Sequence, residues 1–513
     1  MRSLELVLAF MNMILLAGIC LRGVSLKRSV MFGWAISLVL LLLHVKYEGA
    51  RWEMIPLYLL TLLPIILLLR SWRQKRQGAN PVQRRRGIRL LIFTVALLYG
   101  AVAVLLPIAL PVLKFEPLKG PYSVGTVTYT WTDRSRPQVH AESPTERRKL
   151  SVQFWYPTDE HESSQAAPYL KHPKIFANAF GQNEGVPPFL FDSLRLVKSR
   201  SMEAAPLSTE EKQYPVILYS HGNRGWSGQS TFLTEQLASQ GYIVVGIEHA
   251  GGTNVTVFPD GTVIPFYADA GQKLDNHAFD QLADEVWVPD VKFVLDQLEE
   301  MEKGSTTPAE EGTSQAAERF AKRMDLDKIG IVGYSLGGAA AVQTLLSDDR
   351  LQAGINMDGG FYGSLRAPQG IGRPFMLIQA KGTFGADAMS DEQLAAVGAT
   401  REQYEQTVGE LLKRQDHAAA GGNYVLTLER TDHTSFSDTP LYSPLLSAAS
   451  GLDARGAHTV IEDYTMAFFD KYLKGEPVDL SALKVAKGTK HTLIQGQGED
   501  AGMEGRQTAD DRR

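Results

Sequence analysis

The sequence of 513 residues predicts an α/β protein with a mainly parallel sheet and helices on both faces, preceded by an all-α region of about four transmembrane helices. Two observations predict this class. Apolar runs fill residues 4–113, and beyond them strand-like segments alternate with helical ones, as in parallel sheets joined by helices. We therefore expect a transmembrane region at 1–114, an α/β domain at 115–475 and a polar, disordered tail at 476–513.

Each of the four apolar runs is close to the length of about 20 residues that a helix needs to cross a bilayer. The loops that follow the first and third runs, at 22–28 and 70–89, are rich in lysine and arginine, and such loops face the cytoplasm. We therefore expect a multi-pass protein of the cell membrane, in contact with the bilayer, whose α/β domain is extracytoplasmic. The runs are Leu4–Leu21, Val30–Val45, Met54–Leu69 and Ile88–Leu113.

Composition argues against several other classes of function. Charged residues make up 21% of the chain and the net charge is −5, which gives no basic surface for nucleic acid. The single cysteine, Cys20, lies in the first apolar run, so the α/β domain has neither a disulfide nor a thiol nucleophile. The sequence has no Cys-x-x-Cys, His-Glu-x-x-His or P-loop motif, and we expect neither a metal nor an organic cofactor.

After residue 114, alternating β-branched and aromatic residues predict two antiparallel edge strands. A polar stretch then predicts loops and short helices as far as Glu211, and Gly304–Ala316 is a second polar loop. Pro289 should kink or restart the long helix that contains it. The expected strands are Tyr122–Trp131, Leu150–Tyr156, Tyr214–Tyr219, Tyr242–Glu248, Ala353–Met357, Pro374–Ala380 and Asn423–Leu428; a hairpin lies within Asn254–Tyr267; the helices are Ser230–Ser239, His277–Lys303, Asp391–Arg414 and Thr459–Leu473.

One motif indicates chemistry. Residues 328–343 form an apolar strand, a sharp turn and a helix of small residues, with Ser335 at the centre of a Gly-x-Ser-x-Gly pattern. In a nucleophile elbow the serine sits on a strained strand-to-helix turn, and glycines are needed two residues before and after it. Gly333 and Gly337 occupy these places. We therefore predict that Ser335 is a nucleophile; a glycine-rich turn that only packs a helix against a strand is the alternative.

A serine nucleophile needs a base within hydrogen-bond reach and an acid that orients the base. In the α/β-hydrolase arrangement these residues follow in the chain order serine, acid, histidine. Asp358 ends the first strand after the elbow and is the predicted acid. His433 follows the strand at 423–428 and is the predicted base. Sequence neighbours rarely reach the imidazole in the required geometry, so we expect Asp432 and Asp438 to cap or steady the histidine loop. The other histidines after Asp358 fit the role less well: His417, His458 and His491.

The oxyanion hole needs two backbone N–H groups. One should come from Leu336, the residue after the nucleophile, and the other from a loop that follows an earlier strand. Tyr214–Tyr219 is such a strand, and we predict that Asn223 N–H is the second donor. His221 and His249 lie at strand ends, and we expect them to support these loops rather than to act in catalysis.

Four phrases resemble the plasma-type platelet-activating factor acetylhydrolases, namely Tyr-Pro-Val-Ile-Leu-Tyr-Ser-His-Gly at 214–222, Gly-Tyr-Ile-Val-Val-Gly-Ile-Glu-His at 241–249, Gly-Tyr-Ser-Leu-Gly-Gly at 333–338 and His-Thr-Ser-Phe-Ser-Asp at 433–438. The resemblance covers roughly 150–473. It implies an α/β-hydrolase fold and calcium-independent cleavage of short or oxidised acyl chains from phospholipids, with Ser335, Asp358 and His433 as the triad and Leu336 and Asn223 at the oxyanion hole. The N-terminal membrane region is not part of the secreted form of that family.

These observations predict a membrane-anchored serine ester hydrolase that acts on short-chain or lipid acyl esters through an acyl-enzyme. Three alternatives stay open. The same triad would serve a serine peptidase or a thioesterase. The hydrolase domain would be inactive in a membrane-anchored binding or sensor protein. The four apolar runs would form a transport or signalling unit, although they contain few ionisable residues for a substrate path.

Overall fold

The structure is a computed structural model, which describes residues 1–22, 28–76, 86–139, 145–160, 166–267, 276–303, 318–383, 389–396, 398–485 and 488–496. The chain divides into two compact units. Unit 1 contains Met1–Lys114 together with two later segments, Pro168–Val197 and Leu441–Ala449, that the sequence placed in the α/β domain. Unit 2 contains the other residues of the chain and holds the β-sheet.

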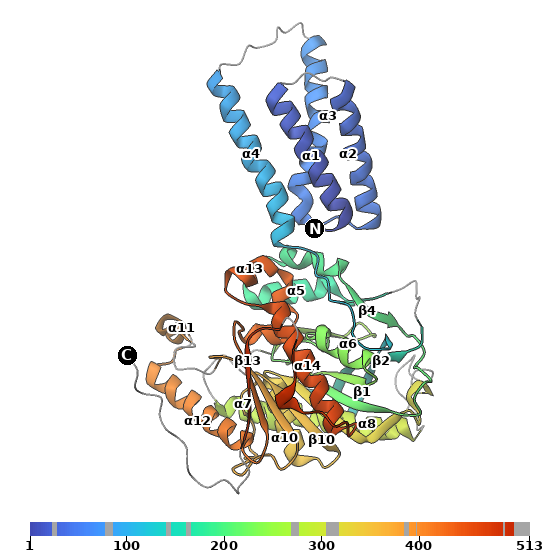
Figure 1. Cartoon of the computed structure of the whole chain (residues 1–513), viewed down its shortest axis with the longest axis vertical. Helices are drawn as coiled ribbons and strands as arrows, with labels where there is room; N and C mark the ends of the chain where they lie inside the picture. Colours follow the sequence, from blue (N-terminus) through green and yellow to red (C-terminus); the bar gives the residue numbers. More distant parts are fainter. Residues whose placement is uncertain are drawn as a thin grey trace. The chain divides into compact units, whose positions relative to one another are not determined.

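Unit 1 is helical (Figure 1). Its long helices form where apolar residues run on for several turns, and a small apolar core buries Leu8, Leu57 and Ala103 between them. A buried ion pair also links the N-terminal helix to the loop before η1, since the Arg51 guanidinium donates to both oxygens of Glu5 at 2.7 and 3.0 Å. The elements are α1 (Ser3–Arg22), α2 (Arg28–Tyr47), η1 (Trp52–Met54), α3 (Ile55–Arg76), α4 (Arg86–Ala109), α5 (Pro173–Glu184), η2 (Pro188–Leu196) and α13 (Pro444–Ala449).

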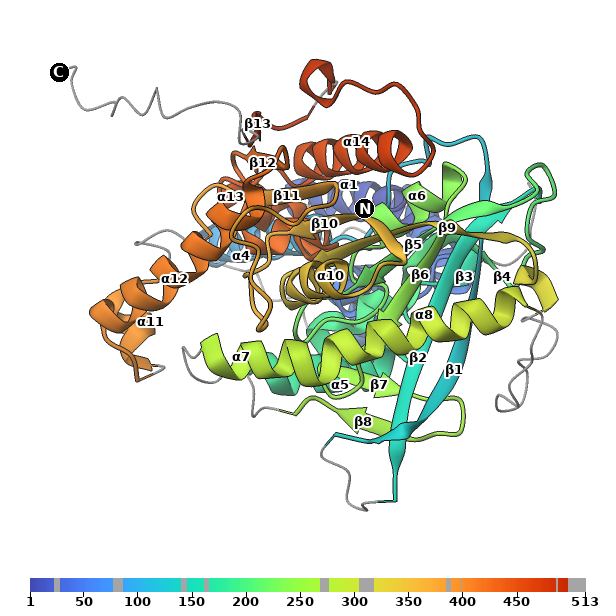
Figure 2. The same cartoon turned by 90° about the horizontal axis from the view of Figure 1, so that it is seen from below.

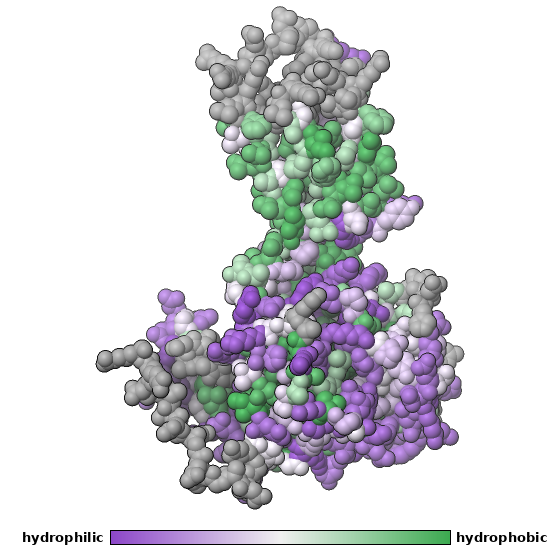
Figure 3. All heavy atoms as spheres, viewed as in Figure 1, coloured by the Kyte–Doolittle hydropathy of each residue, from purple (hydrophilic) through white to green (hydrophobic). Residues whose placement is uncertain are grey.

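Hydrophobic residues gather over the described parts of α1–α4 (Figure 3). Within the described residues, however, none of the helices combines the length and the apolar character needed to cross a membrane. The prediction of four transmembrane helices is therefore not supported, although helices do form at all four apolar runs. Parts of the two basic loops, residues 23–27 and 77–85, lie outside the described residues.

Unit 2 is built on one sheet, in which the described residues form eleven strands in the order β13-β12-β11-β10-β9-β5-β6-β2-β1-β4-β3 (Figure 1). The run from β12 to β6 is parallel throughout, which confirms the predicted mainly parallel sheet. The strands are β1 (Ser123–Pro137), β2 (Arg147–Thr158), β3 (Ala166–Pro168), β4 (Lys198–Glu203), β5 (Tyr214–Ser220), β6 (Ile243–Glu248), β9 (Met324–Tyr334), β10 (Leu351–Met357), β11 (Phe375–Ala380), β12 (Tyr424–Leu428) and β13 (His491–Gln495).

Helices cover both faces of this sheet, as the sequence predicts; Figure 2 shows α14 on one side and α8 on the other. The strands β5 and β6, and β9 from Ile329 onwards, are almost wholly buried, which is why their residues form continuous apolar runs in the sequence. The helical elements are α6 (Thr231–Ser239), α7 (Asn276–Leu282), the π-helix η3 (Ala283–Trp287), α8 (Val288–Glu302), α10 (Leu336–Ser347), α11 (Asp391–Ala396), α12 (Arg401–Ala419), η4 (His433–Phe436), η5 (Thr439–Tyr442), α14 (Ala454–Tyr472) and η6 (Leu480–Ala482).

In unit 2 the structure confirms some of the predicted local elements and differs from others. The hairpin forms, with β7 (Val255–Val257) antiparallel to β8 (Val263–Pro265), and the helix restarts at Val288 with Pro289 in its first turn. The predicted antiparallel strands pair as β1 and β2, but two further strands, β4 and β3, lie outside them at the sheet edge. The sequence predicts disorder at 476–513, but within this segment β13 forms and pairs antiparallel with β12. Residues 304–317 and 497–513 lie outside the described residues.

Candidate active site

The elbow forms at the end of β9, where the chain turns sharply into α10. Ser335 precedes the helix with φ 55° and ψ −121°, a strained conformation for a residue with a side chain. The flanking glycines are required by close packing: a Cβ on Gly333 would lie 1.9 Å from the carbonyl oxygen of Gly337, and one on Gly337 would lie 2.2 Å from that of Ser220. This arrangement places Ser335 at the carboxyl end of a central strand, where ligands bind in open α/β sheets.

The three residues predicted as a triad lie in one hydrogen-bonded chain. Ser335 Oγ is 2.9 Å from His433 Nε2, and His433 Nδ1 is 2.7 Å from Asp358 Oδ2. Asp358 is fully buried, whereas the His433 side chain is 42% exposed. The hydrogen-bonded chain therefore runs from the buried Asp358 to the partly exposed His433 and Ser335.

Asp358 is surrounded by donors, so its carboxylate acts only as an acceptor. Besides His433, the Ala380 N–H donates to Oδ1 at 2.8 Å and the Thr383 hydroxyl donates to Oδ2 at 2.9 Å. A carboxylate in this setting fixes the proton of His433 on Nδ1 and leaves Nε2 free to accept from Ser335. The sequence analysis did not identify Thr383, because a threonine in a loop after a strand carries no motif of its own.

The loop that carries His433 is held by three contacts. The buried Tyr334 hydroxyl donates to the His433 carbonyl oxygen at 2.8 Å. Asp432 forms a capping box with Ser435 at the start of η4. The carboxylate of Asp438 accepts from two backbone N–H groups at the start of α6, at 3.0 and 3.1 Å. Both aspartates thus cap or steady the loop, as expected, and neither replaces Asp358 as the partner of the imidazole.

The residues predicted for the oxyanion hole lie beside the nucleophile. A Cβ added to Gly222 would be 3.1 Å from Ser335 Cβ, so the backbone before Asn223 packs directly on the elbow. Leu336 is the first residue of α10, where an N–H group has no acceptor within the helix. Within the described residues, neither the Asn223 nor the Leu336 N–H donates to a protein acceptor. Their use as oxyanion donors is a proposal.

His221 and His249 are fully buried next to this loop, in agreement with the expected supporting role. Burial lowers the pKa of His221 to about 3 and also lowers the pKa of His249, so both imidazoles are neutral near pH 7. His249 Nε2 lies 2.9 Å from Ser220 Oγ and its Nδ1 lies 3.0 Å from Asp290 Oδ2. This second Ser-His-Asp chain has no exposed member and cannot meet a substrate.

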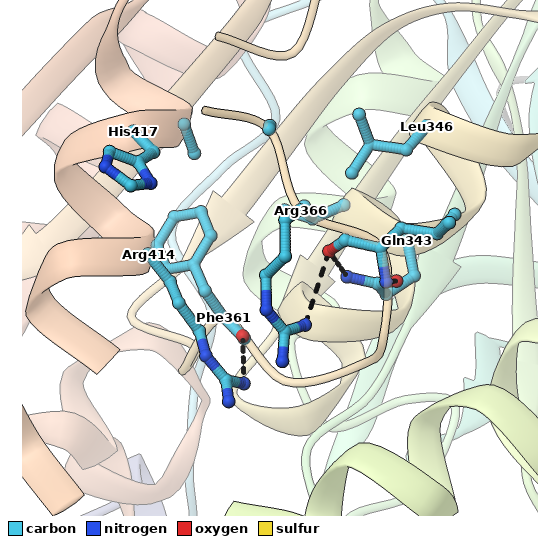
Figure 4. A pocket seen from close by; sticks show the side chains of 10 residues that line it. Gln343, Leu346, Phe361, Arg366, Arg414 and His417 are labelled. Carbon is cyan, nitrogen blue, oxygen red and sulfur yellow. Dashed lines mark hydrogen bonds between the residues drawn. The ribbon is translucent and has the colours of Figure 1, made fainter. Parts of the chain in front are cut away.

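A hollow elsewhere in unit 2 lies between α10 and α12 (Figure 4). None of the predicted site residues lines it, and its positive charges are already neutralised. Arg414 pairs with Asp280 at 2.7 Å and also with Glu410, and Arg366 lies 3.5 Å from Asp280. The hollow therefore provides no free charge for an anion.

Among the described residues, one group could supply three metal ligands: Glu5, His44 and Glu48 in unit 1. These side chains are already engaged, because Glu5 pairs with Arg51, and the His44 imidazole bonds Glu48 at 3.0 Å and the Tyr58 hydroxyl at 2.7 Å. The group is accounted for without an ion.

A serine, a histidine and an aspartate joined at the carboxyl ends of strands in a mainly parallel sheet define the α/β-hydrolase class. Residues 109–483 match the family described as "Platelet-activating factor acetylhydrolase, isoform II". Because the match covers well over half of the chain, this protein belongs to that family.

Individual relatives are more distant. The chain is 25% identical over 251 residues to the platelet-activating factor acetylhydrolase of Cavia porcellus, covering 47% of this chain and 54% of that protein. It is 28% identical over 149 residues to a probable 1-alkyl-2-acetylglycerophosphocholine esterase of Arthroderma benhamiae, covering 29% of this chain and 32% of that protein. The chain thus matches about half or less of the length of these curated relatives.

A solved structure with a similar fold is a ferulic acid esterase from Streptomyces cinnamoneus. The two proteins are 24% identical in sequence, and the match covers 74% of this chain and 98% of the esterase with a TM-score of 0.54. At this identity the likeness shows the fold alone, and it agrees with the α/β-hydrolase-like sheet of unit 2.

Proposed function

We propose that this protein is a serine-dependent carboxylic ester hydrolase in which Ser335 is the nucleophile, His433 the general base and Asp358 the acid that orients the histidine. The single observation that carries the proposal is the unbroken hydrogen-bonded chain from Ser335 Oγ through both imidazole nitrogens to Asp358. The names of its relatives, which are esterases and acetylhydrolases, support the same class of reaction.

The geometry supports acyl transfer to water in two steps. His433 Nε2 takes the proton of Ser335 as Oγ attacks the ester carbonyl carbon, and the buried Asp358 carboxylate stabilises the imidazolium that forms. The N–H groups of Leu336 and Asn223 would hold the developing oxyanion. His433 then gives its proton to the leaving alcohol. In the second step it takes a proton from a water molecule as the water oxygen attacks the acyl carbon, and it returns that proton to Ser335 Oγ as the bond from the acyl carbon to Oγ breaks and the carboxylic acid leaves. No step needs a metal or an organic cofactor.

For the substrate we propose an ester with a short acyl chain, of the kind found in an acetylated or oxidised phospholipid. Two named relatives support this choice: an acetylhydrolase of platelet-activating factor and a probable esterase of 1-alkyl-2-acetylglycerophosphocholine. The His433 side chain is 42% exposed, so the bulky remainder of such a lipid would be able to stay in solvent beside the reacting ester.

We also propose that unit 1 attaches the protein to the cell membrane and that unit 2 lies on the extracytoplasmic side. Large apolar side chains are exposed on the helices of unit 1, among them Phe32 at 71%, Ile66 at 60% and Leu98 at 62%. Contiguous apolar surface of this kind marks a lipid or protein contact. The lysine- and arginine-rich loops at 22–28 and 70–89 are the basis of the proposed orientation, which requires the apolar runs that flank them to cross the bilayer. Retention in carbonate-washed membranes, with unit 2 digestible from outside intact cells, is the expected result; recovery in the soluble fraction would contradict it.

The first test is hydrolysis of p-nitrophenyl acetate, butyrate and a long-chain ester by the full-length protein, beside the variant Ser335→Ala. We expect turnover of the short esters and its loss in the variant. Ser347→Ala is the matched control, since this serine is the last residue of α10 and its hydroxyl, the group that the substitution removes, donates to the Gln343 carbonyl oxygen.

Labelling by a fluorophosphonate probe shows separately whether Ser335 is activated. Amide and thioester analogues of the preferred acyl group separate an esterase from a peptidase or a thioesterase. A wild-type protein that neither hydrolyses any ester nor reacts with the probe would refute the proposal and favour an inactive binding protein.

A further inference from the structure

The peptide between Gly222 and Asn223 determines where the second proposed oxyanion donor points. A trans peptide is planar, and its C=O and N–H point in opposite directions. The direction of the Asn223 N–H is therefore fixed by whatever holds the Gly222 carbonyl oxygen. If this peptide turned over, a carbonyl oxygen would face the developing negative charge instead of a donor.

Two groups hold that carbonyl oxygen. The Gly225 N–H donates to it at 2.8 Å, as the tight turn requires. The other group is the imidazole of His221, whose Nδ1 lies 2.7 Å from Gly222 O. A contact of this length to a carbonyl oxygen is attractive only if Nδ1 carries a proton.

The tautomer of His221 is set from its other side. The backbone N–H of His249 donates to His221 Nε2 at 3.1 Å, so Nε2 is the acceptor and the proton of the neutral imidazole must be on Nδ1. The position of His249 is fixed in turn by its own buried side chain, which bonds Ser220 and Asp290. Burial keeps His221 neutral, since its pKa is lowered to about 3.

Asp290 anchors this arrangement to the core. Arg148 Nε donates to its carboxylate at 3.0 Å, and Arg136 lies 2.9 Å from it. Because Arg148, His249 and Asp290 are almost fully buried, little water competes with the contacts among these three side chains.

We propose that His221 is a positioning residue for the oxyanion hole, which holds the Gly222 carbonyl oxygen through a proton fixed on Nδ1 and so keeps the Asn223 N–H directed at the reacting carbonyl. This inference rests on the proposed esterase function. It assigns a defined chemical task, donation from Nδ1, to a histidine that never touches the substrate.

Two substitutions separate this task from a general structural role. Asn bears its amide on Cγ, as His bears Nδ1, so His221→Asn keeps a donor for Gly222 O and loses the acceptor for the His249 N–H. Gln places its amide near the position of Nε2, so His221→Gln keeps that acceptor and loses the donor. Both variants are polar and of similar size, and each removes one hydrogen bond.

Both variants are measured in the full-length protein for kcat and KM with p-nitrophenyl acetate, for the affinity of a trifluoromethyl ketone with a short alkyl chain, and for melting temperature. The ketone forms a tetrahedral adduct with the serine, so its affinity reports the oxyanion hole. We expect His221→Gln to lower kcat on the order of 10²-fold with little change in KM, and to weaken the ketone by a similar factor. His221→Asn should stay near wild type in both.

Equal loss in the two variants, or wild-type activity in His221→Gln, would overturn the inference while leaving the esterase intact. If the wild-type protein is inactive, or if Ser335→Ala keeps its activity, the proposed function itself fails, and the inference fails with it. Should His221→Gln fold poorly, its folded fraction is determined by circular dichroism, and kcat and the ketone affinity per folded molecule then decide between the two roles.

Discussion

Replacing Asp358 with Asn should nearly abolish ester hydrolysis while leaving the fold in place. In the structure the two carboxylate oxygens accept from Ala380 N–H, Thr383 O–H and His433 Nδ1–H. The Ala380 N–H belongs to β11 and cannot turn away, so the amide oxygen of Asn must face it. The amide NH2 group then points at His433 and requires Nδ1 to be an acceptor.

This requirement moves the imidazole proton to Nε2, opposite Ser335 Oγ, where the base can no longer take the serine proton. The wrong tautomer in a serine triad lowers kcat by about 10⁴-fold, which corresponds to about 5 kcal/mol in the activation free energy. The assay is kcat/KM for p-nitrophenyl acetate with the full-length protein, together with its melting temperature.

Asp432→Asn is the matched control, since this aspartate is adjacent to His433 in sequence but its carboxylate bonds Thr434 and Ser435. We expect the control to stay close to wild type. An Asp358→Asn protein that is folded and loses less than about tenfold in kcat/KM would refute the assignment of Asp358, because such a loss is about 1.4 kcal/mol.

Three further outcomes are expected. Gly337→Ala should lower the free energy of unfolding in urea by about 3 kcal/mol, because the new methyl would overlap a carbonyl oxygen of β5. Gly409→Ala, in open space on α12, should instead raise the free energy of unfolding by up to about 1 kcal/mol. Equal effects of the two substitutions would contradict this reasoning. Asp438→Ala should cost about 2 kcal/mol in the same assay through the lost cap of α6, and an unchanged midpoint would count against it. Burial lowers the pKa of His221 and His458 to about 3 in the folded state, below their value of about 6.5 in the unfolded state. The unfolded chain therefore binds more protons between these pH values, and the free energy of unfolding falls as pH drops from about 6.5 towards 3. At about pH 5 each histidine should cost about 2 kcal/mol, and a free energy of unfolding that does not change with pH would exclude this.

The candidate site could be predicted because its residues carry strong local constraints. Gly333 and Gly337 are dictated by contacts closer than any Cβ allows, so the elbow is visible in five residues of sequence. Asp358 and His433 follow from the order of strands in a parallel sheet, and the structure brings both side chains within hydrogen-bond distance of the chain that begins at Ser335. Their catalytic roles stay predictions until a variant is measured.

Other parts of the fold carry no such signal. Two strands at or near the edges of the sheet are held by backbone pairing with their neighbours, so polar side chains do not prevent these strands from forming. They are β4 (Lys-Ser-Arg-Ser-Met-Glu) and β13 (His-Thr-Leu-Ile-Gln). The division into units is equally hidden, since nothing in the composition of Pro168–Val197 indicates that it packs with helices far away in sequence. Such pairings depend on the whole fold, which local periodicity does not encode.

Unit 1 is assembled from three separate stretches of chain, so the protein has no single point at which its helical part can be detached. A proteolytic nick after Lys114 would leave the N-terminal piece held by noncovalent packing, such as the edge-on contact of Trp52 with Phe189 at 5.0 Å. A gene shortened at the same place would strip the later stretches of their partners, including the Ala109 carbonyl oxygen that accepts from the Ser443 hydroxyl at 2.6 Å. The N-terminal helices therefore cannot be exchanged for others on their own, because any replacement would also have to pack against both later segments of unit 1.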